Sequence, residues 1–232
     1  MQVDNGDFGT VIVTGGASGL GAAVASALAD EGGTPVVLDR VPPADGLDYE
    51  QVDLAHPREA EAAVRRAAER HGGLDAVVSC AGTDACGDLG DVDAEDWERV
   101  IMVNLIGTAA VVRSSLAYLE ASRGRVVTVA STLGLRALPA ATAYCASKFG
   151  VVGFTRALAA ETADRIGVTL LLPGGMATHF FDSREEEFKP APDQVLNRPE
   201  DVARSVLFAL AQPPGCELRE MLVAPAVEPS WP

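Results

Sequence analysis

Short apolar runs alternate with longer segments of helical periodicity along most of the chain. The short runs are rich in valine, isoleucine and leucine and are bounded by glycine, proline or charged residues, which is typical of buried strands. The pattern predicts seven strands, at residues 8–14, 35–39, 49–53, 74–79, 125–130, 168–172 and 220–223. It predicts helices between them at residues 19–31, 57–71, 93–119 (one long helix or two), 143–162 and 199–211.

This alternation predicts an α/β protein with a doubly wound Rossmann fold. Strands that are apolar at nearly every position need helices on both faces of a parallel sheet, and right-handed crossovers then give the doubly wound order. No linker or internal repeat divides the chain, so residues 1–232 are expected to form a single domain. The irregular segment 174–198 follows the carboxyl end of a strand, where such folds bind ligands. It is expected to be a substrate loop, with an ordinary solvated loop as the alternative.

Composition narrows the range of functions. Hydrophobic residues make up 48% of the chain and charged residues 22%, which is typical of a globular protein. The net charge of −15 disfavours binding to nucleic acid or to anionic membrane surfaces. Four scattered cysteines without metal-binding spacing, and no recognisable leader or membrane span, favour a cytoplasmic protein with reduced thiols and no metal.

A glycine-rich turn, TGGASGLG at residues 14–21, joins the first strand to the first helix. Backbone N–H groups at such a turn can approach a phosphate without obstruction by Cβ atoms. The spacing differs from the common G-x-G-x-x-G, and glycine also serves in turns that bind nothing. The position of the turn after the first strand of an α/β series favours a phosphate site.

Asp39 ends the second predicted strand. A carboxylate at this place can accept the ribose hydroxyls of a dinucleotide and repels a 2′-phosphate, although a simple turn-forming role is the alternative. Arg40 beside it can accommodate that phosphate. NAD(H) is therefore the preferred cofactor, and NADP(H) remains possible.

The strongest candidate for catalysis is the pair Tyr144 and Lys148, which lie four positions apart and so share one helical face. An ammonium group about 4 Å away can lower the pKa of a phenol by enough for acid–base work near neutrality. Ser131 follows the fifth predicted strand and can hydrogen-bond the same substrate oxygen. Asn104 is a polar residue inside an apolar run, where burial requires hydrogen-bond partners.

Together these residues resemble the single-domain short-chain dehydrogenases/reductases, over nearly the whole chain. The resemblance rests on an ordered set: TGGASGLG, Asp39, Asp53-Leu54, CAG at 80–82, Asn104, Ser131, YCASK at 144–148 and Pro173-Gly174.

The resemblance implies specific roles. Tyr144 would be the general acid/base, Lys148 would lower its pKa and bind the nicotinamide ribose, and Ser131 would hold the substrate oxygen. Asn104 would hold a water molecule in a proton relay to Lys148. The residues expected to contact the cofactor are Gly15, Ser18, Gly19, Leu20, Gly21, Asp39, Arg40, Asp53, Leu54, Cys80, Ala81, Gly82, Tyr144, Lys148, Pro173, Gly174, Met176 and Thr178.

One position departs from the family pattern. Cys80 stands where the family usually has asparagine in an Asn-Ala-Gly sequence. A thiol is a poor substitute for a carboxamide as a hydrogen-bonding group. We expect looser cofactor geometry at this point, with activity retained.

These features predict an NAD(P)(H)-dependent oxidoreductase that interconverts a secondary alcohol and a ketone. A lyase or epimerase that uses NAD transiently would need the same residues, and a dinucleotide-binding regulator would need only some of them. The substrate pocket is expected to have a mixed, mainly apolar lining without an anion-binding cluster, formed by Leu133, Leu138, Asp84, Met176, His179, Phe180 and Phe181. Arg136 is either a partner for a substrate carboxylate or a surface residue.

The helix predicted at 143–160 is apolar on nearly every face. Such a helix needs cover on every side, and the sheet can supply it on only one. A second subunit is expected to cover the rest, which agrees with the dimers and tetramers usual in the family. Trp231, near the carboxyl end, is either a second anchor or a capped terminus.

Overall fold

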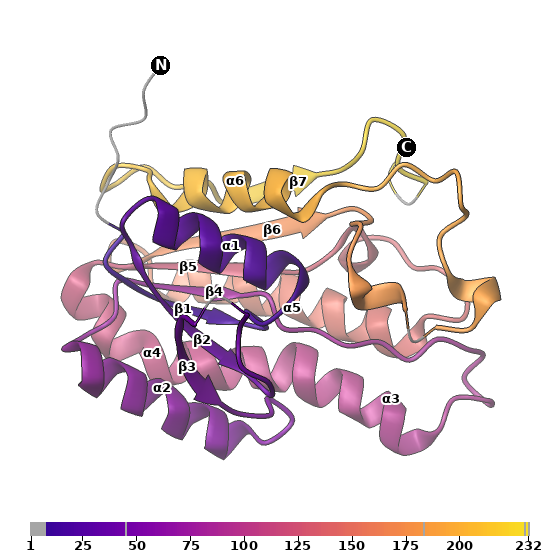
Figure 1. Ribbon diagram of the computed structural model, residues 1–232, viewed down its shortest axis with the longest axis horizontal. Coiled ribbons are helices and arrows are strands. Elements are labelled where there is room, and N and C mark those ends of the chain that lie inside the picture. Colours follow the sequence, from indigo (N-terminus) through magenta and orange to yellow (C-terminus); the bar gives the residue numbers. More distant parts are fainter. Residues whose placement is uncertain (1–7, 45, 183, 230, 232) are drawn as a thin grey trace.

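Seven parallel strands form one sheet in the order β3-β2-β1-β4-β5-β6-β7 (Figure 1). The computed structural model describes residues 8–44, 46–182, 184–229 and 231. The sheet confirms the predicted seven-stranded parallel Rossmann fold. The strands are β1 (Thr10–Thr14), β2 (Thr34–Asp39), β3 (Asp48–Gln51), β4 (Ala76–Ser79), β5 (Arg125–Val129), β6 (Gly167–Pro173) and β7 (Glu220–Val223).

Helices cover both faces of this sheet (Figure 1). On one face lie α1 (Gly19–Asp30) and α6 (Pro199–Leu210). On the other lie α2 (Pro57–His71), α4 (Thr108–Ser122) and α5 (Thr142–Glu161). The short helices are α3 (Ala94–Ile101), η2 (Thr132–Gly134), η3 (His179–Phe181) and η4 (Glu186–Phe188).

The central strand β1 shows why the fold needs two helical layers. Its side chains alternate across the sheet: Ile12 packs into the core under α2 and α4, whereas Val11 and Val13 pack into the core under α1 and α6. All three side chains are fully buried. An apolar residue at every position of a strand is stable only when both faces are covered.

The predicted helix 93–119 proves to be three consecutive helical segments. A π-helical turn, η1 (Met102–Gly107), separates α3 from α4. Among the described residues, Ala94–Ser122 is the one stretch that is long and apolar enough in composition to cross a membrane. Half of its most apolar part is buried inside the protein, where α4 packs on α2 and on the sheet. It is a core helix.

The predicted boundaries of the strands and helices agree with the structure to within a few residues. The third strand ends earlier than predicted, for a local reason. It ends at Gln51 rather than at residue 53. The Asp53 carboxylate accepts a hydrogen bond from the backbone N–H of Ala55 at 2.9 Å, which turns the chain toward α2.

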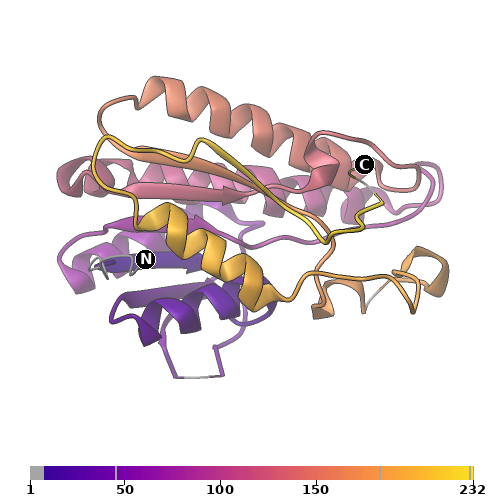
Figure 2. The same cartoon turned by 90° about the horizontal axis from the view of Figure 1, so that it is seen from above.

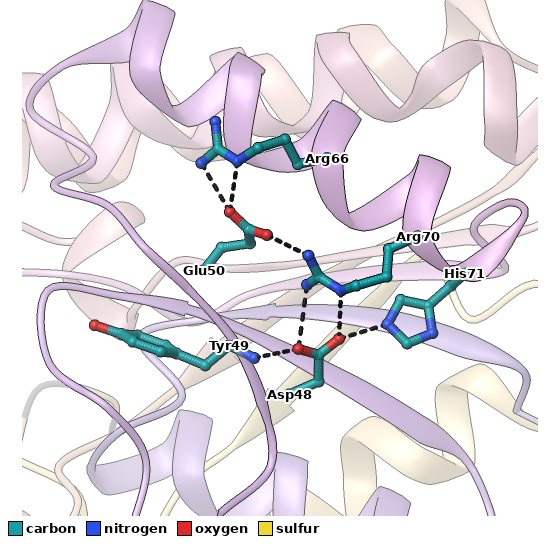
Figure 3. A network of polar contacts seen from close by, with 6 residues as sticks. All are labelled: Asp48, Tyr49, Glu50, Arg66, Arg70 and His71. Atoms are coloured by element: carbon teal, nitrogen blue, oxygen red, sulfur yellow. Dashed lines mark hydrogen bonds and ion pairs between the residues drawn. The ribbon is translucent and has the colours of Figure 1, made fainter.

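A network of ion pairs fastens the edge strand β3 to the last turns of α2 (Figure 3). Arg70 donates to both oxygens of Asp48, at 3.0 and 3.1 Å, and to Glu50 at 2.6 Å. Arg66 binds the other oxygen of Glu50 at 2.8 Å, and His71 Nε2 lies 2.5 Å from Asp48. β3 carries few apolar side chains, so these charged contacts hold the outermost strand in register.

Replacing Asp48 with asparagine is expected to lower the free energy of unfolding by about 1 kcal/mol at neutral pH, because the pair is partly exposed and screened. Burial alone would raise the pKa of Asp48, but hydrogen bonds from His71 and Arg70 outweigh it and hold the pKa below its ordinary 3.8. The stabilisation is therefore complete above that ordinary value and is lost as the pH falls through the folded-state pKa.

Urea unfolding of both proteins from neutral pH to about pH 3 measures this difference. The gap between wild type and Asp48→Asn should narrow toward the acid end. Asp201→Asn, which removes an exposed pair with Arg204, is the control and should change little. A gap that stays constant across the whole range would contradict the assigned role of Asp48.

Candidate active site

A cleft of about 690 Å³ opens along the carboxyl ends of the central strands. Its volume falls within the roughly 300–1,000 Å³ usual for small-molecule sites. All the residues predicted to contact the cofactor line this cleft, together with Ser131. They come from segments far apart in the sequence, which the parallel sheet brings to one edge.

The glycine-rich turn between β1 and α1 is closely packed against its neighbours. Gly15 has a φ of +68°, and a Cβ there would lie 2.8 Å from the Cα of Ala81. A Cβ on Gly21 would lie 2.2 Å from the carbonyl oxygen of Gly15. Side chains at these positions would push the backbone of the turn apart, so glycine is needed to keep its shape. A turn of this shape fits the approach of a dinucleotide phosphate to backbone N–H groups at the start of α1.

Asp39 connects the end of β2 to this turn. One carboxylate oxygen accepts a hydrogen bond from the N–H of Ala17 at 3.0 Å, and the other accepts one from the N–H of Arg40 at 2.6 Å. The carboxylate thus lies between the glycine-rich turn and the strand end. The side chains of both Asp39 and Arg40 belong to the wall of the cleft.

Asp53 lies at the same end of the cleft but has a partner that the sequence analysis missed. Arg99, from α3, donates to its carboxylate at 2.7 Å. Burial would raise the pKa of Asp53, but this hydrogen bond and the one from Ala55 lower it. The two residues are 46 positions apart, and no spacing rule links them.

Tyr144 and Lys148 share one face of α5, as the spacing predicts, and both line the cleft. The Lys148 Nζ lies 5.6 Å from the centre of the Tyr144 ring and donates to the carbonyl oxygen of Val129 at 2.9 Å. Ser131, just past β5, is hydrogen-bonded to Tyr144 through its side chain. The three residues therefore line the same cleft as the glycine-rich turn.

The pKa of Tyr144 differs from the one expected from its spacing to Lys148. Burial raises the pKa of Tyr144 well above its ordinary value, the Asp84 charge raises it further, and the hydrogen bond to Ser131 only partly offsets this. Burial also lowers the pKa of Lys148 to about 8. The expected lowering of the Tyr144 pKa by Lys148 is not found, because desolvation of the phenol is the largest effect on that pKa.

Asn104 lies in the π-helical turn η1 and is buried behind the cleft rather than in its wall. Its amide oxygen accepts from the N–H of Thr83 at 2.8 Å. Its amide nitrogen donates to the Thr83 carbonyl at 2.9 Å and to Ser147 at 3.0 Å. These bonds fix the chain after β4 against α5. Gly107 ends the turn, where a Cβ would lie 2.7 Å from the Leu54 carbonyl.

Cys80 occupies the first position of the chain after β4 and lines the cleft. Burial raises the pKa of its thiol to about 12, so the sulfur is neutral near neutral pH. The neighbouring Ala81 N–H donates to the Thr14 hydroxyl at 3.1 Å, which ties this segment to β1. The segment after β4 is thus anchored by a hydrogen bond that does not involve the side chain of Cys80.

The substrate side of the cleft contains all seven residues predicted for it. The segment between β6 and α6 and the C-terminal tail lie at the same end of the molecule, orange and yellow in Figure 2. Both supply lining residues that the sequence analysis missed, namely Arg184, Phe188, Lys189, Gln194, Glu228 and Pro229. Arg136 does not line the cleft. Its guanidinium lies 5.0 Å from the ring centre of Trp231, which anchors the tail within the same chain.

The fold and the cleft define a dinucleotide-binding oxidoreductase, and comparison with known proteins gives the family. A family profile described as short chain dehydrogenase matches residues 9–189. The chain belongs to the short-chain dehydrogenase/reductase family, whose cofactor is NAD(P).

Related sequences agree with this assignment. The chain is 33% identical over 94% of its length to glycine betaine reductase of Emericella nidulans, of which it spans only 19%. It is 31% identical over 92% of its length to an uncharacterized oxidoreductase of Staphylococcus aureus, and this match covers 96% of that protein.

Solved structures are similar as well. The aldohexose dehydrogenase of Thermoplasma acidophilum, solved in ligand-free form, superposes with a TM-score of 0.86 at 25% identity. The match covers 96% of this chain and 94% of that one. A variant of actinorhodin polyketide ketoreductase, solved with NADPH, superposes with a TM-score of 0.82 at 28% identity. This match covers 93% of this chain and 95% of that one. The alcohol dehydrogenase of Thermococcus sibiricus, complexed with 5-hydroxy-NADP, shares the fold with a TM-score of 0.83, at 23% identity over 92% and 95%.

Replacing Gly21 with alanine is expected to weaken binding of NADH or NADPH at least about tenfold, because the new Cβ would displace the backbone of Gly15. Titration of the nicotinamide fluorescence measures the affinity. Gly90→Ala is the matched control, since a Cβ there meets nothing within 4 Å. Equal affinities for wild type and Gly21→Ala would show that the turn does not hold the cofactor.

Proposed function

We propose that the protein interconverts a secondary alcohol and a ketone of a small or medium-sized metabolite. The observation that carries this proposal is the meeting of Tyr144, Ser131 and Lys148 at the wall of a cleft that also contains the glycine-rich turn. Residues 1–232 would act as one catalytic domain, with 174–198 as the substrate loop. When bound, the reduced nicotinamide supplies the hydride.

The protein's own part is to bind the cofactor, orient the substrate and donate a proton to it. In the reductive direction the Tyr144 hydroxyl donates its proton to the substrate carbonyl oxygen, and the Ser131 hydroxyl donates a hydrogen bond to the same oxygen. The raised pKa of Tyr144 means that the phenol carries a proton near neutral pH. Lys148 binds the nicotinamide ribose, and Asn104 holds the water that returns a proton through Lys148.

The cofactor is proposed to be NAD(H), with NADP(H) as the alternative. The Asp39 carboxylate, held between the glycine-rich turn and β2, would bind the ribose hydroxyls and repel a 2′-phosphate. Arg40 lies beside it in the cleft wall and is the feature that permits NADP(H). Two of the similar structures were solved with NADP-type ligands, so the comparison leaves this choice open.

Replacing Tyr144 with phenylalanine is expected to lower kcat at least about a hundredfold while cofactor affinity is retained, because only the transferable proton is removed. A panel of ketones and secondary alcohols, assayed with both cofactors by nicotinamide absorbance, measures the turnover. We expect NADH to bind more tightly than NADPH. Tyr118→Phe on α4 is the control. Wild-type rates in Tyr144→Phe, or binding of cofactor without net turnover of any substrate, would overturn the proposal.

We propose further that the protein is a cytoplasmic homo-oligomer. All four cysteines are free, which agrees with a reducing compartment. The outward face of α5 is small and apolar around Phe149, whose side chain is 45% exposed, and the adjoining η1 exposes 38% of Ile106. A second copy of the chain would cover this face.

Replacing Phe149 with glutamate is expected to convert the oligomer to a monomer, since a charge would be buried at the centre of the contact. Light scattering after size exclusion measures the mass, and nicotinamide fluorescence checks that the cofactor still binds. Leu89→Glu, at an exposed site elsewhere, is the control. A wild-type mass equal to one 24.1 kDa chain would refute the oligomer.

A further inference from the structure

The tail, residues 224–229, runs from the end of β7 back to the cleft and places a carboxylate against the loop after β6 (Figure 2). Glu228 Oε2 accepts a hydrogen bond from the N–H of Gly175 at 2.9 Å. Both residues line the cleft, together with their neighbours Pro229 and Gly174. The tail is therefore part of the wall of the cleft.

Two consecutive glycines leave room for this carboxylate. A Cβ on Gly174 would lie 2.2 Å from Glu228 Oε2 and 3.2 Å from Cδ of Pro225. A Cβ on Gly175 would lie 2.7 Å from Cδ2 of Leu196. Neither glycine has a φ in the left-handed region. Glycine is needed here because neighbouring segments approach closely, and not because of the backbone conformation.

Both backbone polar groups of Gly175 are used. Its carbonyl oxygen accepts a hydrogen bond from the N–H of Asn197 at 2.9 Å, shortly before α6. The Asn197 side chain donates in turn to the carbonyl oxygen of Val223 at 3.1 Å, at the end of β7. The N–H of Gly175 is bound by Glu228. Loss of this carboxylate would leave a half-buried N–H without its acceptor, which destabilises the contact between loop and tail.

The far end of the loop is held without Glu228. Met176 pairs with Asn197 in a single β-bridge, and the N–H of Ala177 donates to the Asn197 carbonyl oxygen at 2.9 Å. Thr178 Cγ2 lies 3.4 Å from the position that a Cβ on Gly19 would take, so this end contacts the glycine-rich turn. Release of the tail would therefore move the substrate end of the cleft and leave the glycine-rich turn in place.

Trp231 holds the tail at a second point. Its N–H donates to the carbonyl oxygen of Glu228 at 3.0 Å, and its ring centre lies 5.0 Å from the guanidinium of Arg136. The N–H of Arg136 donates to the carbonyl oxygen of Thr132 at 3.1 Å, directly after Ser131. The tail thus links the segment after β5 to the loop after β6.

We propose that Glu228 is a positioning residue. Its carboxylate fixes the backbone of Gly175, and through Trp231 and Arg136 it sets the spacing between the loop after β6 and the segment that carries Ser131. The proposal rests on the function proposed above, in which Ser131 binds the substrate oxygen. It assigns Glu228 no bond-making step. Its consequence is that the carboxylate controls how the substrate is placed, and not how tightly the cofactor binds.

The first experiment needs no substrate. The chain has two tryptophans, so replacing Trp97 with phenylalanine leaves Trp231 as the sole fluorophore of its kind. Quenching of its fluorescence by acrylamide then measures how exposed this indole is. In this background Glu228→Ala should raise the quenching constant at least about twofold, because the tail loses its bond to Gly175. Glu228→Gln should keep the original constant, because a carboxamide oxygen accepts the same N–H.

Gly174→Ala tests the same contact from the other side. Its methyl group would take the place of Glu228 Oε2, so it should release the tail as Glu228→Ala does. The double variant should be quenched no more than either single variant, because both changes act on one contact. Glu31→Ala, at an exposed site directly after α1, and Gly90→Ala, with open space around its Cβ, are the matched controls.

Equal quenching constants for the parent, Glu228→Ala and Gly174→Ala would overturn the proposal, whatever reaction the protein performs. Additive effects in the double variant would do the same. Far-UV circular dichroism checks that the effect is local: a spectrum of Glu228→Ala that differs from that of the parent would mean that the fold itself depends on the carboxylate, which also contradicts a positioning role.

The second experiment uses a substrate identified by the panel. Glu228→Ala should lower kcat at least about tenfold, because a small misplacement of the substrate relative to Tyr144 slows the reaction. The NADH affinity, measured by nicotinamide fluorescence, should change less than about twofold. Glu228→Gln should restore kcat. An unchanged kcat in Glu228→Ala, a weakened NADH affinity, or loss of activity in Glu228→Gln would each overturn the proposal. Failure of the panel itself would count against the proposed function and not against the quenching result.

Discussion

The parallel pairing of β1 with both β2 and β4 is the constraint on which the rest of the structure depends. It places the ends of the three strands side by side, so that Gly15, Asp39 and Cys80 meet although they are distant in sequence. The close approach of Gly15 to Ala81 leaves no room for a side chain in the turn. The cleft lies at this edge because all the strands are parallel, so that their carboxyl ends and the loops that follow them come together there.

Burial determines the protonation of Tyr144 and Lys148, the two proposed catalytic residues on α5. The same desolvation that raises the pKa of Tyr144 lowers that of Lys148 to about 8, so both groups favour their neutral forms compared with water. Among the neighbours of Tyr144, the Asp84 charge raises its pKa further, whereas the Ser131 hydroxyl and the Arg184 charge lower it.

Local patterns in the sequence were enough to predict some features of the site and insufficient to predict others. The four-residue spacing of Tyr144 and Lys148 places both on one helical face in any α-helix, and the structure has them so. Asn104 was noticed as a polar residue in an apolar run, but its partners Thr83 and Ser147 and the π-helical turn that presents it could not be foreseen.

The sequence by itself determined the order of strands and helices and the two-sided burial of the sheet, because periodicity is a local property. The residues that line the cleft were expected partly from the glycine-rich turn and the Tyr144–Lys148 spacing, and for the rest from the family resemblance. Only the tertiary structure decided that Arg99 pairs with Asp53, that Arg184 pairs with Asp84, and that Arg136 lies on Trp231 rather than in the pocket. Ion pairs between distant segments depend on where loops and tails are carried by the packed core. Desolvation, which reverses the expected pKa shift of Tyr144, likewise appears only once every neighbour is in place.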